Sequence, residues 1–315
     1  MIRRTLLALP ALALVPAAHA QPPRPVVIGI LNWTTLAVDD LLLTEFTRAG
    51  YTSARGVTLA VRNCAGSATT AASVAAELVA LRPDLIIATA TGPALAAKAA
   101  TSQIPILVSA ADPLGSGLVS SLARPDGNIT GVSVSSFELI AKRLEIASQL
   151  IPGLARTAFL AQLGEPNVAR FESALAEAGT RLGVQVFTIG AAPDASLTVA
   201  IGEAAAGGAQ VVLPQPIFLD GPCIAAAALR HRMPVVADGR ALALAGIPLT
   251  YGIDRAYTWS RLVAMADRIL RGAKPADLPL EQGLRTLLHV NLRAASAIGL
   301  TIPAALIDRA DEVIE

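Results

Sequence analysis

The sequence has few of the side chains on which most enzyme chemistry depends. It contains three histidines and two cysteines in 315 residues, and the histidines after the first 20 residues are His231 and His289. His231 stands between two arginines, His289 lies in an apolar run, and no Gly-x-Ser-x-Gly motif accompanies either of them. Isolated cysteines and histidines also do not give the spacing of a zinc site. We therefore expect a protein that is not an enzyme, with no catalytic residue and no metal.

Nucleotide-binding and nucleic-acid-binding patterns are missing as well. No Gly-x-x-x-x-Gly-Lys-Ser/Thr loop occurs, and the first apolar run is not followed by Gly-x-Gly-x-x-Gly, so we expect no cofactor. Aromatic residues make up 3% of the chain, the net charge is +1, and no basic block occurs. These properties exclude the positive surface and the stacking platforms that nucleic-acid binders use.

Residues 1–20 are predicted to be a signal peptide. Arg3 and Arg4 give a positive start, residues 5–17 are apolar, and Ala18-His19-Ala20 fits a cleavage site, so the mature chain should begin at Gln21. A membrane anchor is the alternative, but this apolar stretch is short and contains two prolines. Charges interrupt every later apolar run. We expect a periplasmic or secreted protein that is not membrane-embedded after cleavage.

The remaining chain alternates short apolar runs with helical stretches, which is typical of parallel sheets covered by helices. The predicted strands form two series, over residues 26–31, 57–61, 85–88 and 106–108, and then 157–161, 185–189, 210–213 and 235–237. Residues 82–87 and 104–108 resemble residues 208–212 and 233–237, so the second series repeats the first. The pattern and the length favour an α/β protein with two similar lobes, and one large sheet is the alternative.

Three extended segments that contain Gly or Pro are predicted to connect the lobes: 128–133, 249–254 and 278–282. They predict lobe 1 over residues 21–131 plus 252–279 and lobe 2 over residues 132–251 plus 280–315. A cleft between such lobes opens and closes on hinges. Cys64 and Cys223 then fall in different lobes. We expect two free, buried cysteines, with a disulfide as the alternative.

Polar residues follow most of the predicted strands. Ligands of open α/β sheets bind beyond the carboxyl ends of the strands, where helix N-termini also lie. Pro93 fits the first position of a helix, which would place Thr91 or Gly92 at its cap and favour an anion there. Each residue has an alternative role in capping a helix or a turn. The candidate ligand-binding residues are Asn32, Trp33, Thr34, Thr89, Thr91, Asp112, Gln162, Gln215, Asp238, Arg240 and Asp254.

Four segments resemble one family of periplasmic solute-binding proteins, the ABC-transporter substrate-binding family that includes tryptophan-binding receptors. They are residues 118–131, 269–279, 299–303 and 309–314. The resemblance implies a two-lobed periplasmic-binding-protein fold of type I-like topology with three hinge crossovers. The chain departs from the family pattern at Thr91-Gly92-Pro93, at Ala111-Asp112-Pro113 and at residues 240–244. These departures fall near the expected cleft and leave the identity of the ligand open.

The resemblance also implies a function in binding and delivery. The expected partners are a small-molecule ligand, an amino acid or similar polar molecule, and the permease and ATPase subunits of an ABC importer, with the receptor acting as a monomer. A zwitterionic ligand would place its anion at Thr89 and Thr91 and its ammonium at Asp112, Asp238 or Asp254, with Trp33 stacked on its side chain. A periplasmic sensor that signals to a membrane receptor or kinase is the alternative, and an enzyme on this fold is a third hypothesis.

Overall fold

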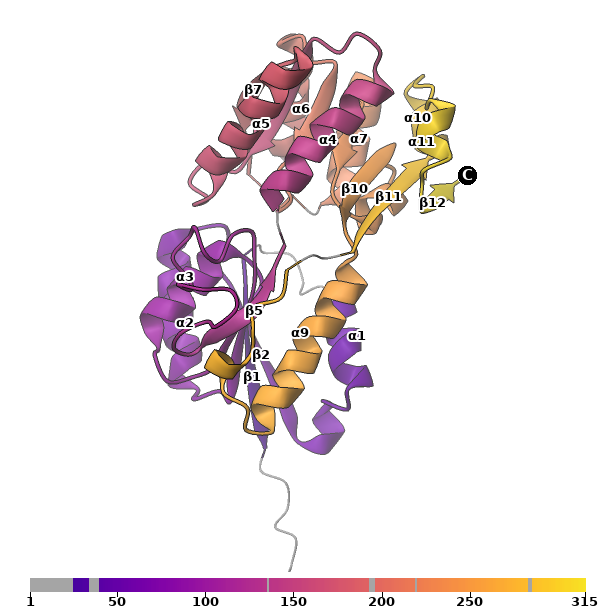
Figure 1. The fold of residues 1–315 in the computed structure, drawn as a ribbon. Helices are drawn as coiled ribbons and strands as arrows, with labels where there is room; N and C mark the ends of the chain where they lie inside the picture. The colour runs from indigo at the N-terminus through magenta and orange to yellow at the C-terminus, as the bar shows by residue number, and fades with distance from the viewer. Residues whose placement is uncertain (1–24, 34–39, 135, 193–195, 219, 283–284) are drawn as a thin grey trace, which may run out of the picture.

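The computed structural model consists of two α/β lobes joined end to end (Figure 1). The predicted signal peptide and Thr34 lie outside the residues that the structure describes. These are residues 25–33, 40–134, 136–192, 196–218, 220–282 and 285–315. None of the helices in these ranges has the length and apolar character needed to cross a membrane.

Lobe 1 is built on a parallel sheet with the strand order β2-β1-β3-β4-β5. Its strands are β1 (Val26–Asn32), β2 (Val57–Asn63), β3 (Leu85–Ala88), β4 (Ile106–Ala110) and β5 (Ile129–Ser133). Strands β3 and β4 are buried along their whole length, because helices cover both faces of the sheet. One face packs against α1 (Asp40–Arg48) and α9 (Arg255–Leu270), and the other packs against α2 (Ala68–Ala80) and α3 (Thr91–Ala100). The short helix η1 (Ser53–Arg55) precedes β2.

Lobe 2 repeats this order. Its parallel strands are β6 (Arg156–Ala161), β7 (Gln185–Gly190), β8 (Val211–Pro214), β9 (Val236–Ala237) and β10 (Leu249–Ile253). They lie in the order β7-β6-β8-β9-β10, in which a bridge between Val212 and Val235 joins β8 to β9. Antiparallel β11 (Thr286–Asn291) and then β12 (Glu312–Ile314) extend the sheet. The two lobes therefore share one strand order, as the local sequence repeat predicts.

Alternate residues of β6 serve two cores in lobe 2, because successive side chains of a strand point to opposite faces. Phe159 and Ala161 face α4 (Ser136–Leu150) and α5 (Val168–Leu182). Ala158 and Leu160 face α6 (Ser196–Ala206) and α7 (Gly221–His231). The remaining short helices are α8 (Arg240–Leu244), η2 (Pro275–Asp277), α10 (Leu292–Ala297) and α11 (Ala304–Ile307).

The lobes exchange one helix each. Helix α4 follows β5 of lobe 1 but packs its apolar side, with Ile140, Leu144 and Ala147, into the core of lobe 2. Helix α9 follows β10 of lobe 2 but packs Trp259 and Leu262 into the core of lobe 1 (Figure 1). The chain thus passes between lobes after β5 and after β10, and a third time between η2 and β11.

The segments predicted as linkers take part in the sheets. Residues 129–133 are β5 and residues 249–253 are β10, because each has a row of backbone partners in its own lobe. In the third segment, Glu281 forms a parallel bridge with Val132. Neither Cys64 nor Cys223 is part of a disulfide, as expected, but Cys223 is only half-buried.

Candidate functional site

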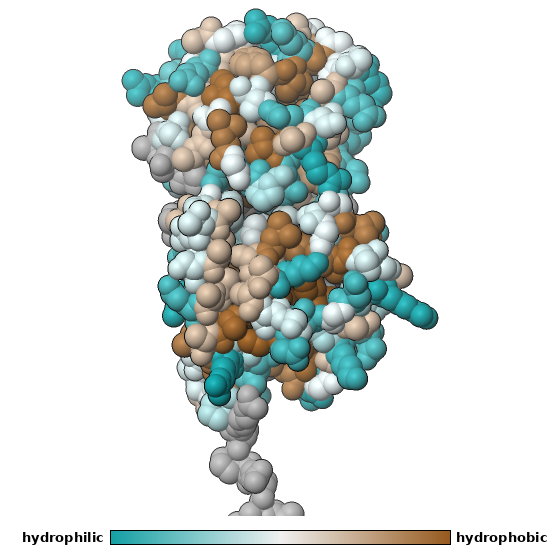
Figure 2. All heavy atoms as spheres, turned by 90° about the vertical axis from the view of Figure 1, so that its left-hand side faces the viewer, coloured by the Kyte–Doolittle hydropathy of each residue, from teal (hydrophilic) through white to brown (hydrophobic). Residues whose placement is uncertain are grey.

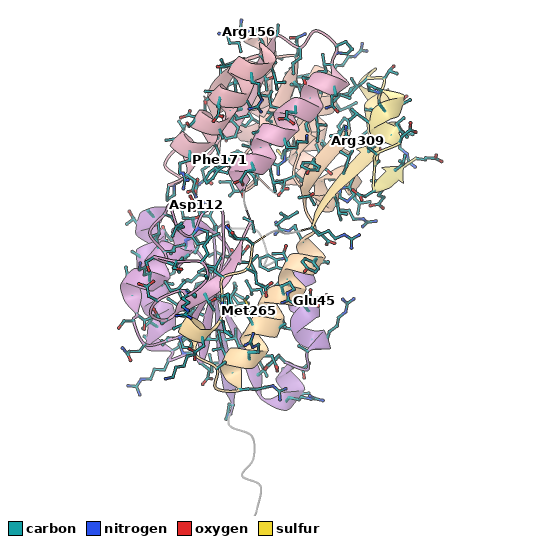
Figure 3. All side chains as sticks on the ribbon, viewed as in Figure 1. Glu45, Asp112, Arg156, Phe171, Met265 and Arg309 are labelled. Atoms are coloured by element: carbon teal, nitrogen blue, oxygen red, sulfur yellow. The ribbon has the colours of Figure 1, made fainter. Side chains whose placement is uncertain are left out.

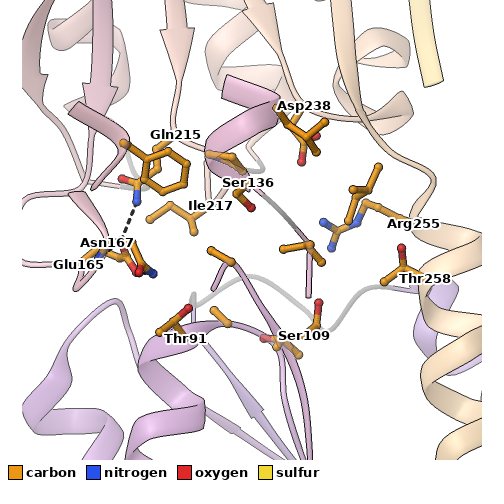
Figure 4. A pocket seen from close by; sticks show the side chains of 18 of the residues that line it. Thr91, Ser109, Ser136, Glu165, Asn167, Gln215, Ile217, Asp238, Arg255 and Thr258 are labelled. Atoms are coloured by element: carbon orange, nitrogen blue, oxygen red, sulfur yellow. Dashed lines mark hydrogen bonds between the residues drawn. The ribbon is translucent and has the colours of Figure 1, made fainter. Parts of the chain in front are cut away.

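A cavity of about 90 Å³ lies between the lobes, where the carboxyl ends of both parallel sheets meet (Figure 4). A cavity needs only about 10–15 Å³ to hold one water, so this one has room for a small molecule. Residues that follow β3, β4, β5, β8, β9 and β10 all contribute to it. The lining residues are Thr89, Ala90, Thr91, Ser109, Ala111, Val134, Ser136, Leu139, Arg143, Glu165, Asn167, Phe171, Gln215, Pro216, Ile217, Asp238, Ile253, Arg255, Thr258 and Trp259.

The two exchanged helices supply walls of the cavity. Ser136, Leu139 and Arg143 recur at the spacing that places side chains on one face of α4. Arg255, Thr258 and Trp259 come from the first turns of α9, where the Arg255 guanidinium lies 5.6 Å from the centre of the Trp259 ring. Because these helices leave one lobe and pack on the other, the cavity lies at the crossing points of the chain.

Arg143 and Asp238 form a buried ion pair in this cavity. Arg143 Nη2 donates to Asp238 Oδ1 at 2.7 Å, and Nε donates to the carbonyl oxygen of Tyr251 at 2.6 Å. Their side chains are 1% and 7% exposed. Burial lowers the pKa of Arg143, and the charge of Asp238 opposes this effect. Within the described part of the chain, the third guanidinium nitrogen, Nη1, has no hydrogen-bond partner.

Gly252 on β10 makes room for Asp238. A Cβ at this position would overlap Asp238 Oδ1. A strand glycine commonly marks such a close approach of another group. The carboxylate of Asp238 therefore lies against the backbone of β10, within reach of the guanidinium that also binds Tyr251 O.

Glu165 lies at the other side of the cavity and is held by three donors. Its Oε2 accepts from the Asn167 backbone N–H and from Gln215 Nε2, and its Oε1 accepts from Asn167 Nδ2, all at 2.9 Å. Burial raises the pKa of Glu165, and the hydrogen bonds from Asn167 and Gln215 oppose this effect. Gln215 Oε1 in turn accepts from the backbone N–H of Gln162. The network fixes three polar side chains at the ends of β6 and β8.

Thr91 and Thr89 line the lobe 1 side. Thr91 is 2% exposed, and its Oγ1 has no hydrogen-bond partner among the residues described. Thr89 Oγ1 donates to Asn32 Oδ1 at 3.1 Å. The cap of α3 is Ala90, so the prediction that Thr91 or Gly92 occupies the cap and Pro93 the first position was wrong by one or two residues. Thr91 is instead the first residue of the helix.

Of the predicted ligand-binding residues, Thr89, Thr91, Gln215 and Asp238 line the cavity. Asn32 supports Thr89 from the end of β1. Asp254 accepts from the Tyr257 backbone N–H and caps α9, which is the alternative role expected for it. Arg240 lies outside the cavity, because both of its terminal contacts, at 2.6 Å, are with Glu312 on β12.

Trp33, Gln162 and Asp112 join the lobes beside the cavity rather than lining it. Trp33 is 2% exposed and donates from Nε1 to Gln162 Oε1 at 3.3 Å, and Gln162 Nε2 donates to Gly66 O at 2.8 Å. Asp112 of lobe 1 is paired with Arg170 of lobe 2. Figure 3 shows Asp112 at the lobe 1 edge of the cleft, below Phe171, and Figure 2 shows the lobes in contact on this side.

The cavity residues that were not predicted from the sequence lie mainly on helices. Arg143 falls among Ile140, Leu144 and Ala147 on the apolar side of α4. A charged residue within an apolar helix face could have indicated from the sequence that Arg143 has a buried, functional role. Glu165 and Asn167 follow β6 closely, like the predicted Gln162, but nothing in the sequence separated them from ordinary loop residues. Among the described residues, no group of three or more His, Cys, Asp or Glu side chains is arranged to hold a metal ion.

Residues 42–314 match the family described as ABC transporter substrate binding protein. The chain is 25% identical over 254 residues to a tyrosine-binding protein of Clostridioides difficile (strain R20291). The alignment covers 80% of this chain and 73% of that protein. Two solved structures are similar over 92% of this chain and 99% of theirs. A Streptococcus pneumonia ABC domain in complex with L-Trp has a TM-score of 0.80 at 23% identity. The ligand-free, open structure of a substrate-binding protein with adhesive properties from Clostridium difficile has a TM-score of 0.61 at 24% identity.

Proposed function

Because this chain belongs to the family of ABC transporter substrate-binding proteins, we propose that it is an extracytoplasmic receptor that binds an amino acid or similar small zwitterion and delivers it to an ABC importer. The importer would supply the permease and the ATPase, and the receptor would act as a monomer. The proposal includes a signal peptide over residues 1–20 and a division into residues 21–131 plus 252–279 and residues 132–251 plus 280–315.

The observation that carries this proposal is the cavity between the lobes, to which each lobe contributes a buried polar atom that has no hydrogen-bond partner among the described residues. These atoms are Thr91 Oγ1 in lobe 1 and Arg143 Nη1 on helix α4 of lobe 2. A buried polar group that lacks a hydrogen bond costs about 1–3 kcal/mol. A ligand that supplies partners to both would therefore favour the arrangement in which the lobes meet, and its binding would be coupled to closure.

The charges of the cavity support a zwitterion. Among the described residues, the charged side chains that line it are Arg143, Arg255, Glu165 and Asp238, two of each sign. A zwitterion brings one group of each sign and leaves this balance unchanged, whereas a net charge would be buried without a counterion. The printed names of two similar proteins, one tyrosine-binding and one in complex with L-Trp, point to the same class of ligand.

A thermal-shift screen of the twenty amino acids, with sugars and simple carboxylates alongside, tests the class of ligand. A ligand that binds only the folded state raises its stability, so an amino acid should raise the melting temperature and then bind in calorimetry. Small-angle scattering with that amino acid should show a smaller radius of gyration than without it. A shift with a sugar and with no amino acid would overturn the proposal.

Delivery is tested separately from binding. Membrane vesicles that contain the candidate permease and ATPase should hydrolyse ATP faster when the receptor and its amino acid are both present. The receptor alone, the amino acid alone, and the receptor with an amino acid that it does not bind are the controls. Binding without any effect on hydrolysis or uptake would leave a receptor but refute its part in transport.

A further inference from the structure

Among the described residues, the ion pair between Arg143 and Asp238 leaves one guanidinium nitrogen and one carboxylate oxygen without a partner. Arg143 Nε donates to Tyr251 O and Nη2 donates to Asp238 Oδ1, and Nη1 has no partner in the described part of the chain. Asp238 accepts with Oδ1 only, so within the described ranges its Oδ2 has no partner either. Both side chains line the cavity and are more than nine-tenths buried. Buried charged groups are rarely left with unused hydrogen-bonding capacity unless a water or a ligand takes it up.

We propose that this pair binds the head group of the ligand, with the α-carboxylate on Arg143 and the α-ammonium on Asp238, and that the ligand side chain extends towards Glu165. The inference rests on the proposed function, because it specifies how a zwitterion lies in the same cavity. It differs from the expectation that the anion binds at Thr89 and Thr91, since it places both charged groups on lobe 2.

The geometry of an α-amino acid matches a single ion pair. Its carboxylate and ammonium are attached to the same carbon, so the protein groups that bind them must also be neighbours. Arg143 and Asp238 are in direct contact at 2.7 Å, and each offers one further atom, the nitrogen Nη1 and the oxygen Oδ2. The ligand head would lie antiparallel to the pair, with each charge beside its opposite. An amine or a simple carboxylate would satisfy one member and leave the other unused.

Glu165 is too far from this pair to bind the same head group. Asp238 follows β9 and Glu165 follows β6, with β8 between these strands. Neighbouring strands are about 4.8 Å apart, so the carboxyl ends of β6 and β9 are separated by roughly 10 Å. Figure 4 shows Asp238 and Glu165 at opposite ends of the pocket, with Ser136 and Ile217 between them. That distance corresponds to the length of a large amino-acid side chain.

The far end of the cavity predicts what kind of side chain it accepts. The wall on this side includes the apolar Phe171, Pro216 and Ile217, and the polar groups beyond are Glu165, Asn167 and Gln215. The carboxylate of Glu165 can only accept hydrogen bonds when it is ionised. We therefore assign to the site an amino acid whose side chain is apolar along its length and ends in a hydrogen-bond donor, such as a phenol or an indole.

The test compares four probes by calorimetry: L-tyrosine, tyramine, 3-(4-hydroxyphenyl)propionate and L-phenylalanine. Tyramine lacks the carboxylate, the propionate lacks the ammonium, and phenylalanine lacks the terminal donor. Each loss should weaken binding to the wild-type protein, by about 10- to 100-fold for the two charged groups, since hydrogen bonds to charged groups are the stronger ones.

Variants then locate the two contacts. In Arg143→Gln, L-tyrosine should bind no better than tyramine within about three-fold, because the carboxylate has lost its partner. In Asp238→Asn, L-tyrosine and the propionate should become similar in the same way, which gives a second test if one variant does not fold. Glu165→Gln should reduce the preference for L-tyrosine over L-phenylalanine. Arg240→Gln, which removes an exposed pair with Glu312 in the same lobe, is the matched control and should change none of these ratios.

The outcomes separate this inference from the proposed function. If no amino acid binds the wild-type protein, the proposed function fails and the inference fails with it. If an amino acid binds but folded Arg143→Gln and Asp238→Asn keep the wild-type ratios, only the placement of the head group is overturned. If amino acids with short aliphatic side chains bind better than L-tyrosine, the assignment of the side chain is overturned. The placement of the head group is then tested in the same two variants, by comparing that amino acid with the amine that lacks its carboxylate.

Discussion

Trp33 of lobe 1 and Gln162 of lobe 2, 129 residues apart in the chain, are joined by a hydrogen bond of 3.3 Å from the indole Nε1 to the amide Oε1. The amide nitrogen of the same glutamine donates to Gly66 O in lobe 1 at 2.8 Å. One side chain of lobe 2 thus uses both ends of its amide to hold two loops of lobe 1. A separation of the two lobes would break both hydrogen bonds.

Gln162→Ala should therefore weaken ligand binding without a contact to the ligand being lost. Two neutral hydrogen bonds contribute about 0.5–1.5 kcal/mol each, so the apparent affinity should fall by roughly ten-fold as the closed arrangement becomes less populated. Calorimetry measures this change. Gln149→Ala, which removes an exposed glutamine bonded to Arg309 within lobe 2, is the control and should bind as tightly as the wild type.

Gly92→Ala should disturb the same junction from the lobe 1 side. A Cβ at Gly92 would overlap the six-membered ring of Trp33, so the indole must move away from Gln162. The variant should bind more weakly and show altered tryptophan fluorescence. Gly202→Ala in helix α6 is the matched control, because the added methyl meets only the end of His231 at 3.2 Å. A shared loss of affinity in both variants would contradict the role of Trp33.

Asp238→Ala should destabilise the folded protein far more than the loss of an exposed ion pair. Removing one partner leaves Arg143 buried without its counterion, and such changes cost about 3–5 kcal/mol of the free energy of unfolding. Arg240→Ala removes a pair with Glu312 whose side chains are partly exposed, which should cost at most about 1 kcal/mol. The free energies of unfolding of the wild type, Asp238→Ala and Arg240→Ala are compared by denaturant unfolding, after circular dichroism has shown that each protein is folded without denaturant.

His289 should make the stability depend on pH between neutral and mildly acidic conditions. Burial lowers its pKa, the charge of Glu312 partly offsets this, and Nδ1 lies 3.1 Å from Thr250 Oγ1. The unfolded chain, with a histidine pKa near 6.5, therefore takes up this proton at a higher pH than the folded protein does. The free energy of unfolding should fall as the pH drops below about 6.5 and rise again as it returns to 7.

The substitution His289→Gln should flatten this part of the pH profile. Chemical denaturation at pH 5, 6 and 7 measures the slope for the variant and the wild type. His231→Gln, at the end of α7, provides the comparison for loss of a histidine as such. Equal slopes in wild type and His289→Gln would show that other groups set the pH dependence.

The mature protein should begin at Gln21. Arg3, Arg4 and the Ala18-His19-Ala20 sequence predict export and cleavage at this point. N-terminal sequencing of protein isolated from the periplasm or the medium should read Gln-Pro-Pro-Arg. Functional protein that retains Met1 would contradict the prediction.

The sequence contains enough information to predict the fold, because the strongest patterns belong to buried strands. The runs at residues 85–88 and 106–108 are apolar throughout, and the structure buries them between helices as β3 and β4. The repeat of residues 82–87 at 208–212 reflects two sheets with the same strand order. The class of protein implied by the resemblance is confirmed by the match over residues 42–314.

The cavity was only partly predictable, since its contacts depend on pairs that are distant in the chain. Thr89, Gln215 and Asp238 follow strands, as the rule for open sheets requires, and they line the cavity. Arg143 was missed because it becomes part of the cavity only when α4 crosses into lobe 2 and meets Asp238, 95 residues later. Arg240 was predicted in the cleft, but its partner Glu312, 72 residues away on β12, holds it elsewhere.

The exchange of α4 and α9 has a consequence for the order in which the protein folds. The sheet of lobe 1 is complete in sequence at Ser133, but α9, one of the two helices that cover the same face of it, is not made until residues 255–270. A nascent chain that ends between these points lacks α9, whose Trp259 and Leu262 share a core with strand residues such as Ile87 and Leu107 in the folded protein. Lobe 1 therefore cannot mature as an N-terminal unit ahead of the rest. Contacts of such long sequence separation slow folding, which leaves time for the chain to be handled as an unfolded polypeptide.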